Sequence, residues 1–471
     1  MNAPQDPKLI ATSAPADMYA ARRRIHPRQL EGFYHRLRTT VRVLALGGIF
    51  LLPWLQWAGE PLVWLDLPAR RFHVFGGTFF ADDVFISAWV LIISAFALFT
   101  FTNIAGRVLC GYACPHSMYF SLFIAIEEFI EGSALQRRKL DRDGLDGRAR
   151  LRRATTWVVW LAFAFAFAFS VMALFVPARE LAPSLVAGTV GGWTLFWLAF
   201  LTVGCFVFAG FLREQACFYM CPYARFQAAM YDKDTLVVSY DVARGEPRSA
   251  RKRGGDGAGD CVDCRLCVDV CPVGIDIREG MQYECIQCGL CVDACKPVMQ
   301  RLGRPTGLIR YSTQNLVEHG LRPFRLARPR LVGYACAMTL MASVFVYYMS
   351  NRVPFDLEVI RERNSLYREV TVASVRDSLV ENSFRLKVAN KTDRAQAFVL
   401  AADGLPELQW IGDRQVVAGP GEILELPVRL RVARSALRPG VNDFSFELRG
   451  EQADGTHSVI VREQHFFGPA S

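Results

Sequence analysis

The residues of this chain most able to do chemistry are eight cysteines arranged in two copies of one pattern. Each copy has three cysteines separated by two residues, and a fourth after three more residues, close to a proline. Three thiolates at this spacing can hold three corners of an iron–sulfur cube from one loop, and the fourth reaches the other cube. Zinc ribbons use pairs of CxxC rather than triplets, so the spacing predicts two [4Fe-4S] clusters and a protein that moves electrons. The predicted ligands are Cys261, Cys264, Cys267 and Cys295 for cluster I, and Cys271, Cys285, Cys288 and Cys291 for cluster II.

A second repeat, CxxxCP, occurs at residues 110–115 and 217–222 and supplies Cys110, Cys114, Cys217 and Cys221. If the four-residue spacing is helical, the two thiols of each copy lie one turn apart on one face. If the proline instead begins a new helix, Cys114 and Cys221 lie at helix N-termini. Either arrangement favours the thiolate, because a helix dipole or a neighbouring cation lowers the pKa of a thiol. The cations nearest in sequence are Arg107, Arg213 and Arg225.

Paired thiolates of this kind could bind a soft metal such as Cu(I), or cycle between dithiol and disulfide. Suitable further ligands would be His116, Met118 and Met220. The alternative is that these cysteines are small buried residues at helix breaks, and the spacing leaves open whether they form one site or two. Three acidic residues at helical spacing follow the first motif and are predicted to form a solvated face: Glu127, Glu128 and Glu131.

At 471 residues, 52% of them hydrophobic, the chain is too long for one domain and too apolar for an ordinary soluble protein. Five apolar segments approach membrane-spanning length. They are residues 43–57, 84–102, 157–176, 190–211 and 331–349. We therefore predict an α-helical transmembrane bundle of five spans, four within residues 43–232 and the fifth at 331–349. Cys205 and Cys336 each stand alone in such a segment and are predicted to be structural.

Lysine and arginine are concentrated in residues 1–42 and in the connection after the second span. Cytoplasmic loops hold the excess of these residues, so the basic N-terminal segment is predicted to be cytoplasmic. Five spans then place residues 233–330, a flexible basic linker at 250–259 and the iron–sulfur motifs, in the cytoplasm. The net charge of +9 follows from this bias and requires no nucleic acid partner.

Residues 350–471 are predicted to lie on the side of the membrane opposite to the cytoplasm. They alternate apolar and polar residues in short runs separated by turn signals. This pattern is typical of strands with one buried face, and predicts an all-β sandwich, immunoglobulin-like but without a disulfide. None of the 14 cysteines falls in this segment, which agrees with thiolates being kept in a reducing compartment. We expect a docking or assembly role for it.

Motifs that bind a dinucleotide, a nucleoside triphosphate or a covalent haem are missing from the sequence. It has no glycine-rich dinucleotide fingerprint after a strand, no Walker loop and no CxxCH haem-attachment motif. The protein is therefore expected to receive electrons from a redox protein or from quinol.

Together, these motifs resemble one family. Two CxxxCP motifs at span ends, a double ferredoxin motif, a fifth span and an external sandwich are similar to the CcoG/FixG-type accessory proteins of cbb-type cytochrome c oxidase, which are membrane-bound polyferredoxins. The resemblance extends from about Arg36 to Phe467 and includes the sequences LPARRF at residues 67–72 and CPYARFQ at residues 221–227.

The resemblance implies copper chemistry in the bacterial inner membrane, with the C-terminal domain in the periplasm. The family is associated with oxidase maturation and is expected to reduce Cu(II) to Cu(I), so the implied partners are copper ions, copper transporters or chaperones, and the oxidase assembly machinery. The CxxxCP cysteines would then be catalytic and would hold copper transiently. Two rivals stay open: an electron conduit from quinol to a soluble partner without copper, and a non-enzymatic assembly scaffold. Pairing of two chains as a homodimer also stays open.

Overall fold

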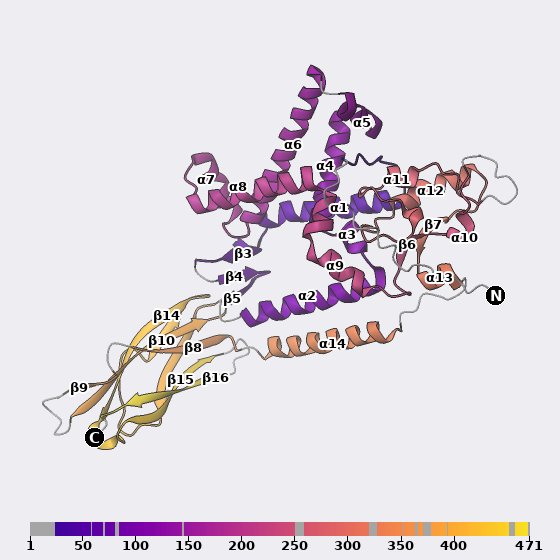
Figure 1. The fold of residues 1–471 in the computed structure, drawn as a ribbon. Coiled ribbons are helices and arrows are strands. Elements are labelled where there is room, and N and C mark those ends of the chain that lie inside the picture. Colours follow the sequence, from indigo (N-terminus) through magenta and orange to yellow (C-terminus); the bar gives the residue numbers. More distant parts are fainter. Residues whose placement is uncertain are drawn as a thin grey trace. The chain divides into compact units, whose positions relative to one another are not determined.

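The computed structural model forms two compact units along the chain (Figure 1). One contains residues 87–343 with the N-terminal part of the chain up to residue 56, and the other contains residues 57–86 and 344–471. The structure describes residues 24–57, 59–68, 71–80, 84–143, 146–249, 259–319, 327–351, 353–362, 366–370, 378–392, 394–451 and 457–469. The N-terminal 23 residues and most of the predicted basic linker, 250–258, lie outside these ranges.

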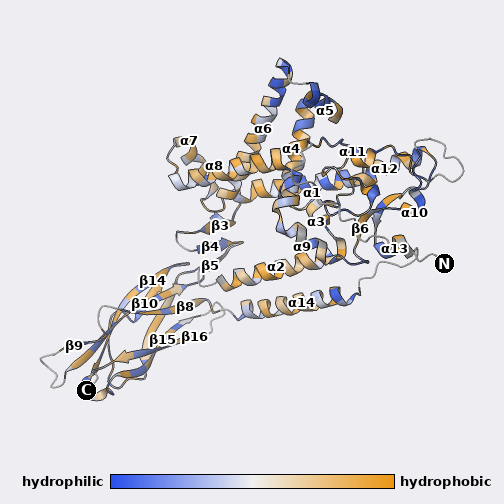
Figure 2. Ribbon diagram, viewed as in Figure 1, coloured by the Kyte–Doolittle hydropathy of each residue, from blue (hydrophilic) through white to orange (hydrophobic). Residues whose placement is uncertain are grey.

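Six helical stretches of the described chain are long and apolar enough to cross a membrane. Five of them overlap the predicted spans, namely Phe33–Trp54, Phe85–Ala105, Gly147–Met172, Gly192–Leu212 and Pro329–Ser350. They consist mainly of α1 (Phe33–Leu51), α2 (Val84–Ala105), α6 (Gly147–Met172), α8 (Gly192–Val207) and α14 (Pro329–Ser350). Figure 2 shows α2 and α8 coloured as hydrophobic along most of their length. A helix pairs its own backbone groups, so such segments can lie in lipid.

The sixth stretch, Val108–Glu131, covers a region that the sequence predicted as a connection between spans. It consists of α3 (Val108–Tyr112) and α4 (Pro115–Glu131), which meet at a break at Cys114. The predicted number of five spans therefore stays a prediction, and this helix pair is the segment on which it depends.

The predicted solvated face of glutamates on α4 is wrong. Glu127 is fully buried and Glu131 is 4% exposed. Glu127 accepts hydrogen bonds from Arg24 at 2.7 Å and from Arg213 at 2.8 Å, and Glu131 lies 2.9 Å from the guanidinium of Arg153. Helical spacing identifies residues that share a face, but it does not reveal that arginines from three other segments cover that face.

The apolar core of the first unit joins membrane helices to the iron–sulfur segment. Trp160 of α6 is fully buried, stacks on Phe123 of α4 and donates its indole N–H to the Phe123 carbonyl at 3.0 Å. Val273 and Ile286, from the iron–sulfur segment, belong to the same buried cluster. Burial of these side chains stabilises the contact between segments, so the cluster loops are held on the helices.

Shorter elements complete the first unit. The helical ones are η1 (Leu52–Trp54), α5 (Ala134–Asp143), α7 (Ala178–Ala187), η3 (Phe208–Leu212), η4 (Ala216–Met220), α9 (Pro222–Met230), α10 (Val242–Gly245), α11 (Leu266–Asp269), η5 (Ile277–Glu279), α12 (Leu290–Arg301) and α13 (Gln314–His319). A two-stranded sheet pairs β6 (Val237–Tyr240) with β7 (Ile309–Ser312), antiparallel.

From residue 353 on, the described part of the second unit forms β-strands and one short helix, η6 (Arg434–Ala436), as the alternation predicted. One sheet has the order β12-β14-β10-β8, with β9 also paired to β10, and the other has the order β13-β11-β15-β16. The strands are β8 (Phe355–Arg361), β9 (Arg368–Val370), β10 (Leu379–Asn390), β11 (Gln396–Asp403), β12 (Gln409–Ile411), β13 (Gln415–Ala418), β14 (Ile423–Ala433), β15 (Val441–Glu451) and β16 (His457–Phe467). Both sheets contribute to one apolar core, which includes Phe384, Val428 and Phe446. Packing of two antiparallel sheets over a shared core defines a sandwich.

Residues 56–80 add small strands. These are β1 (Gln56–Trp57), β2 (Glu60–Pro61), β3 (Val63–Asp66), β4 (Arg71–Val74) and β5 (Gly77–Phe80), of which the last three form a meander. They belong to the connection between α1 and α2.

Candidate iron–sulfur and thiol site

The two CxxCxxC loops share one backbone conformation. In each loop, the residues before and after the second cysteine have positive φ: Asp263 (48°) and Arg265 (55°) in the first, Gln287 (52°) and Gly289 (76°) in the second. A non-glycine residue in this region costs about 1–2 kcal/mol, so the loop needs a compensating interaction. Left-handed residues two positions apart help to turn backbone N–H groups inward, as in the concavities found at iron–sulfur sites. The shared strain therefore fits a cluster loop in both copies.

Each set of four predicted ligands lines one cavity. The first cavity has apolar walls that include Tyr240 of β6, Ile309 of β7 and Met299 of α12. Its cysteines are Cys261, Cys264, Cys267 and Cys295. The second cavity is lined by Cys271, Cys285, Cys288 and Cys291, and also by Cys267. Four thiols in an apolar enclosure fit a cubane cluster; the ligand role of each cysteine stays a prediction.

Burial keeps two of these thiols, Cys267 and Cys271, protonated until a metal centre binds. It raises the pKa of Cys267 to about 11 and that of Cys271 to about 12. Ligation requires the thiolate, so a bound cluster would displace these protons. Helix α12 carries Cys291 and Cys295 one turn apart, yet they line different cavities. This explains how the fourth cysteine of a copy reaches the other cluster.

Arg278 anchors the first loop. Its side chain is 4% exposed and binds the carboxylates of Asp263 and Asp276. Burial alone would raise the pKa of Asp276, but the hydrogen bonds from Arg278 outweigh it and the pKa lies below its ordinary value. Arg278 could not be recognised in the sequence, because an arginine between the two cysteine triplets belongs to no motif.

Both CxxxCP motifs end at a helix break. Helix α4 starts at Pro115 and α9 starts at Pro222, and the preceding residues, Cys114 and Cys221, are extended. Of the two predicted arrangements, the structure therefore has the one in which the proline opens a new helix. Both cysteines lie at the positive ends of these helices.

The two CxxxCP motifs meet in space. Gln227, on the helix that follows the second motif, accepts a hydrogen bond from Sγ of Cys110 in the first motif at 3.3 Å. Cys217 has Cys114, Cys110 and Cys221 as electrostatic neighbours. The structure thus brings the four cysteines into one site, all partly buried and, within the described chain, not in disulfides. No three His, Cys, Asp or Glu side chains among the described residues are arranged to hold a single metal ion, so the thiols are neighbours and not a closed coordination shell.

The three further predicted ligands have different surroundings. His116 donates from Nε2 to the carbonyl of Arg213 at 2.7 Å, which leaves its Nδ1 as the nitrogen that could bind a metal. Met118 is buried in the core at 5% exposure, whereas Met220 is 58% exposed. Of the cations named from the sequence, Arg213 is engaged by a buried glutamate, and the Arg225 side chain lies outside the described residues.

The first CxxxCP motif packs directly against the second cluster loop. A Cβ atom added at Gly111 would lie 2.7 Å from the Ile286 carbonyl oxygen and 3.1 Å from Cα of Cys288. Only glycine permits this approach. Tyr112 donates its hydroxyl to the Cys288 carbonyl at 2.9 Å. The two residues after Cys110 therefore touch the backbone of a predicted cluster II ligand.

Arg107 lies in the same junction and is 3% exposed. Its backbone N–H donates to Gln287 Oε1 at 3.1 Å, and its Nε donates to Gln227 Oε1 at 3.1 Å. A buried cation next to Cys110 favours its thiolate. The sequence pointed to Arg107, but it missed both glutamines, since neither belongs to a motif and each meets Arg107 only through the fold.

Comparison with known proteins bears on both domains. Residues 212–314 match a family described as a 4Fe-4S dicluster domain, and residues 345–469 match one described as an IG-like fold at the C-terminal of FixG. The nitrogen fixation protein FixG of Rhizobium meliloti is 33% identical over 476 aligned positions, which cover 91% of this chain and 90% of that protein. The chain belongs to the FixG family.

A second relative of this FixG-family protein agrees with the assignment. Protein RdxA of Cereibacter sphaeroides is 38% identical over 399 positions, 82% of this chain and 84% of that protein. The crystal structure of a FixG-related protein from Vibrio parahaemolyticus is 33% identical and covers 25% of this chain and 97% of that chain, with a TM-score of 0.21. The predicted family resemblance is confirmed, and with it a membrane iron–sulfur electron-transfer protein with two [4Fe-4S] clusters.

Proposed function

We propose that this FixG-family protein is a cupric reductase that takes Cu(II) as substrate at its CxxxCP cysteines and releases Cu(I) for maturation of a cbb-type haem–copper cytochrome c oxidase. The observation that supports this most is the junction at Gly111, where the first CxxxCP motif touches the loop of cluster II. Electron transfer slows steeply with distance. A thiol site that begins one residue from a cluster loop is therefore well placed to receive its electrons.

The chemistry divides between the clusters and the thiols. The two clusters, when bound, supply electrons one at a time. Thiolates prefer Cu(I) to Cu(II), so Cys110, Cys114, Cys217 and Cys221 would make the uptake of one electron by copper favourable. Arg107 supports a thiolate at Cys110 through its charge, and Gln227 orients the protonated thiol by accepting its S–H. Copper transporters or chaperones would deliver the ion, and the oxidase assembly machinery would receive it.

We infer that α4 starts and ends on the same side of the membrane, so that five helices cross it. Before its first residue, Tyr112 binds the Cys288 carbonyl, and beyond its last residue Arg138 donates to Asp269 at 3.0 Å. Both ends therefore contact the same iron–sulfur segment, which a helix that crosses the bilayer could not do. Five spans and the positive-inside rule support a cytoplasmic N-terminus and a periplasmic sandwich at the bacterial inner membrane.

The test is Cu(II) reduction by anaerobically purified protein that is first reduced and then desalted. Wild type is compared with a variant in which the four CxxxCP cysteines are serine, and with a matched Cys205→Ser, Cys336→Ser variant. Cluster content is measured by EPR in all three. The proposal expects Cu(I) from wild type and from the control, and none from the four-serine variant despite intact clusters. Equal reduction by all three would reject the CxxxCP site.

One observation favours a second candidate, the electron conduit without copper. Cys217 has Cys110, Cys114 and Cys221 as electrostatic neighbours, and paired thiols can relay electrons as a dithiol and disulfide. The conduit predicts no bound copper after anaerobic incubation with Cu(I), and a disulfide between CxxxCP cysteines after oxidation. The cupric reductase predicts copper bound in proportion to protein.

A further inference from the structure

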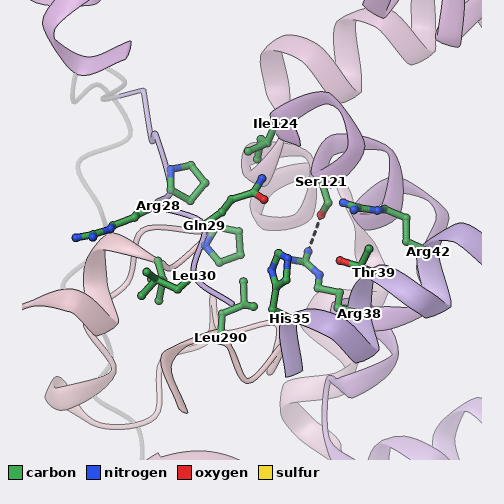
Figure 3. A pocket seen from close by; sticks show the side chains of 13 residues that line it. Arg28, Gln29, Leu30, His35, Arg38, Thr39, Arg42, Ser121, Ile124 and Leu290 are labelled. Atoms are coloured by element: carbon green, nitrogen blue, oxygen red, sulfur yellow. Dashed lines mark hydrogen bonds between the residues drawn. The ribbon is translucent and has the colours of Figure 1, made fainter. Parts of the chain in front are cut away.

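We propose that a cavity between α1, α4 and the iron–sulfur segment binds the phosphate group of an anionic phospholipid. Arg38 and Arg42 enter it from α1, Ser121 from α4, and Pro272 and Leu290 from the iron–sulfur segment. Figure 3 shows the side chains of Arg38 and Arg42 converging on Ser121, with a hydrogen bond from Arg38 to the serine hydroxyl at 2.7 Å. All three segments belong to one compact unit.

Positive charge dominates the cavity. Its lining includes three arginines and His35, and no aspartate or glutamate. Asp293, a carboxylate beside the lining residue His35, accepts the backbone N–H of His35 at 2.8 Å. Arg38 is already bound to the Gly111 carbonyl and to Ser121. Arg42 makes no hydrogen bond or ion pair within the described part of the chain, so a cation is left in the cavity with no counter-ion.

The place of Arg42 in the sequence points to lipid as the source of the anion. It directly precedes the apolar run that begins at Val43, within a helix long enough to span a membrane. The long side chain of an arginine in such a helix extends toward the lipid headgroups. Basic pockets between membrane helices bind anionic headgroups. A phosphodiester also accepts two hydrogen bonds from a guanidinium.

The charge of the cavity favours phosphate over a quinone. The cavity is partly open, with about 50 Å³ of space, room for roughly three or four water molecules, and a phosphate group fits there. A neutral quinone would leave Arg42 without a counter-ion.

A lipid bound here would touch the surroundings of cluster II. Pro272 follows Cys271 and Leu290 precedes Cys291, so the bound phosphate would join α1 and α4 to the loops that hold this cluster. The site does not depend on copper reduction. Anionic lipid would stabilise the contact of the iron–sulfur segment with α1 and α4. This effect is the same whether the thiols reduce copper or pass electrons to another protein.

The experiment measures lipid binding to the delipidated full-length holoprotein in detergent. The probes are dioleoylphosphatidylglycerol, dioleoylphosphatidylcholine, inorganic phosphate and a short-chain ubiquinone, with retained lipid measured by native mass spectrometry and stability by thermal unfolding. Wild type should retain phosphatidylglycerol and gain Tm, and phosphatidylcholine should do neither. Arg42→Gln should lower retention about fivefold, because one arginine near an anionic lipid surface contributes about 1 kcal/mol of binding free energy. Arg36→Gln, with the same charge change on an exposed residue of α1, should retain lipid like wild type.

Each other outcome decides against the lipid. Equal retention by Arg42→Gln and wild type overturns the site. A gain in Tm with phosphate that equals the gain with phosphatidylglycerol assigns the cavity to a free anion, and ubiquinone binding that is lost in Arg42→Gln, with phosphatidylglycerol unaffected, assigns it to a quinone. If Arg42→Gln does not accumulate, Thr39→Glu places a negative charge in the same cavity and should abolish retention, whereas Arg42→Lys should preserve most of it.

Discussion

The two cluster cavities have the same internal construction but different neighbours. Their loops have left-handed residues at matching positions, and each is lined by its four predicted ligand thiols. The first is bordered by the β6–β7 sheet and by Arg278. The second lies against Gly111 and Tyr112 of the first CxxxCP motif. Cysteine spacing therefore specifies the thiols that line each cavity. The residues packed around the cavity determine which other groups lie close enough to exchange electrons with a bound cluster.

This difference predicts an order of electron transfer for the two clusters. Only the second loop, among the described residues, contacts the CxxxCP motif through a position that must be glycine. We expect cluster II to be the immediate donor to the thiols and cluster I to stand earlier in the path.

The largest expected effect comes from removing one ligand of each cluster. Cys288→Ser should abolish Cu(II) reduction by chemically reduced protein, because cluster II is the donor next to the thiols. Cys264→Ser should lose a similar half of the iron but keep a single round of reduction. Iron content, EPR and stopped-flow detection of Cu(I) measure this. Equal loss of reduction in both variants would show that the clusters have no such order.

The second prediction concerns Arg278, which is part of the first cavity alone. Arg278→Gln should destabilise the iron–sulfur segment by about 2–3 kcal/mol, because hydrogen bonds to two carboxylates are lost. Cluster I should be lost first in a chelator challenge followed by EPR. Arg301→Gln, at an exposed position on α12, is the matched control and should behave as wild type. Preferential loss of cluster II would contradict the separate surroundings of the two cavities.

Features encoded by local spacing could be predicted from the sequence. The grouping of cysteines into two sets follows from the triplets, the apolar segments identify five of the six long helices, and alternation predicts the strands β10, β14 and β15. Each of these depends on residues near one another in the chain. Geometry within one loop, helix or strand is enough to recognise them.

Contacts between distant segments could not be predicted in this way. Arg107 and Gln287 are 180 residues apart, and Glu127 is buried by arginines from other segments. Helical period placed the glutamates on one face and suggested solvent, because exposed acidic faces are the common case. The meeting of the four CxxxCP cysteines was left open for the same reason.

The third prediction tests the contact between motif and loop. Gly111→Ala should cost about 1–3 kcal/mol of stability, because the new methyl group overlaps backbone atoms that cannot rotate away. The forced separation should also slow Cu(II) reduction while both clusters remain. Gly204→Ala in α8, where an added Cβ meets nothing within 4 Å, should be neutral or slightly stabilising. Denaturant unfolding and single-turnover kinetics distinguish the two variants.

The smallest effect concerns the N-terminal segment, residues 24–30, which packs on the residues that follow Cys271 of the second cavity. Ile25 packs on Gly274, and the buried ring of His26 lies 2.7 Å from Asp141 of α5. Burial lowers the pKa of His26, although Asp141 and Glu127 oppose this shift. The folded state thus holds the neutral ring, whereas the unfolded segment takes up a proton near its ordinary pKa of about 6.5. The stability of this contact should therefore be complete above that pH and decrease below it.

Hydrogen exchange of residues 24–30, measured between about pH 7.5 and pH 5.5 and corrected for intrinsic rates, should show protection decreasing as the pH falls through the unfolded pKa. His26→Gln should remove this extra pH dependence, whereas His465→Gln in the sandwich should not. Residues 259–267 of the first cavity, which this segment does not cover through any described contact, should keep their protection throughout. A parallel loss there would mean that the two cavities open together, and the contrast between them would then be one of chemistry but not of stability.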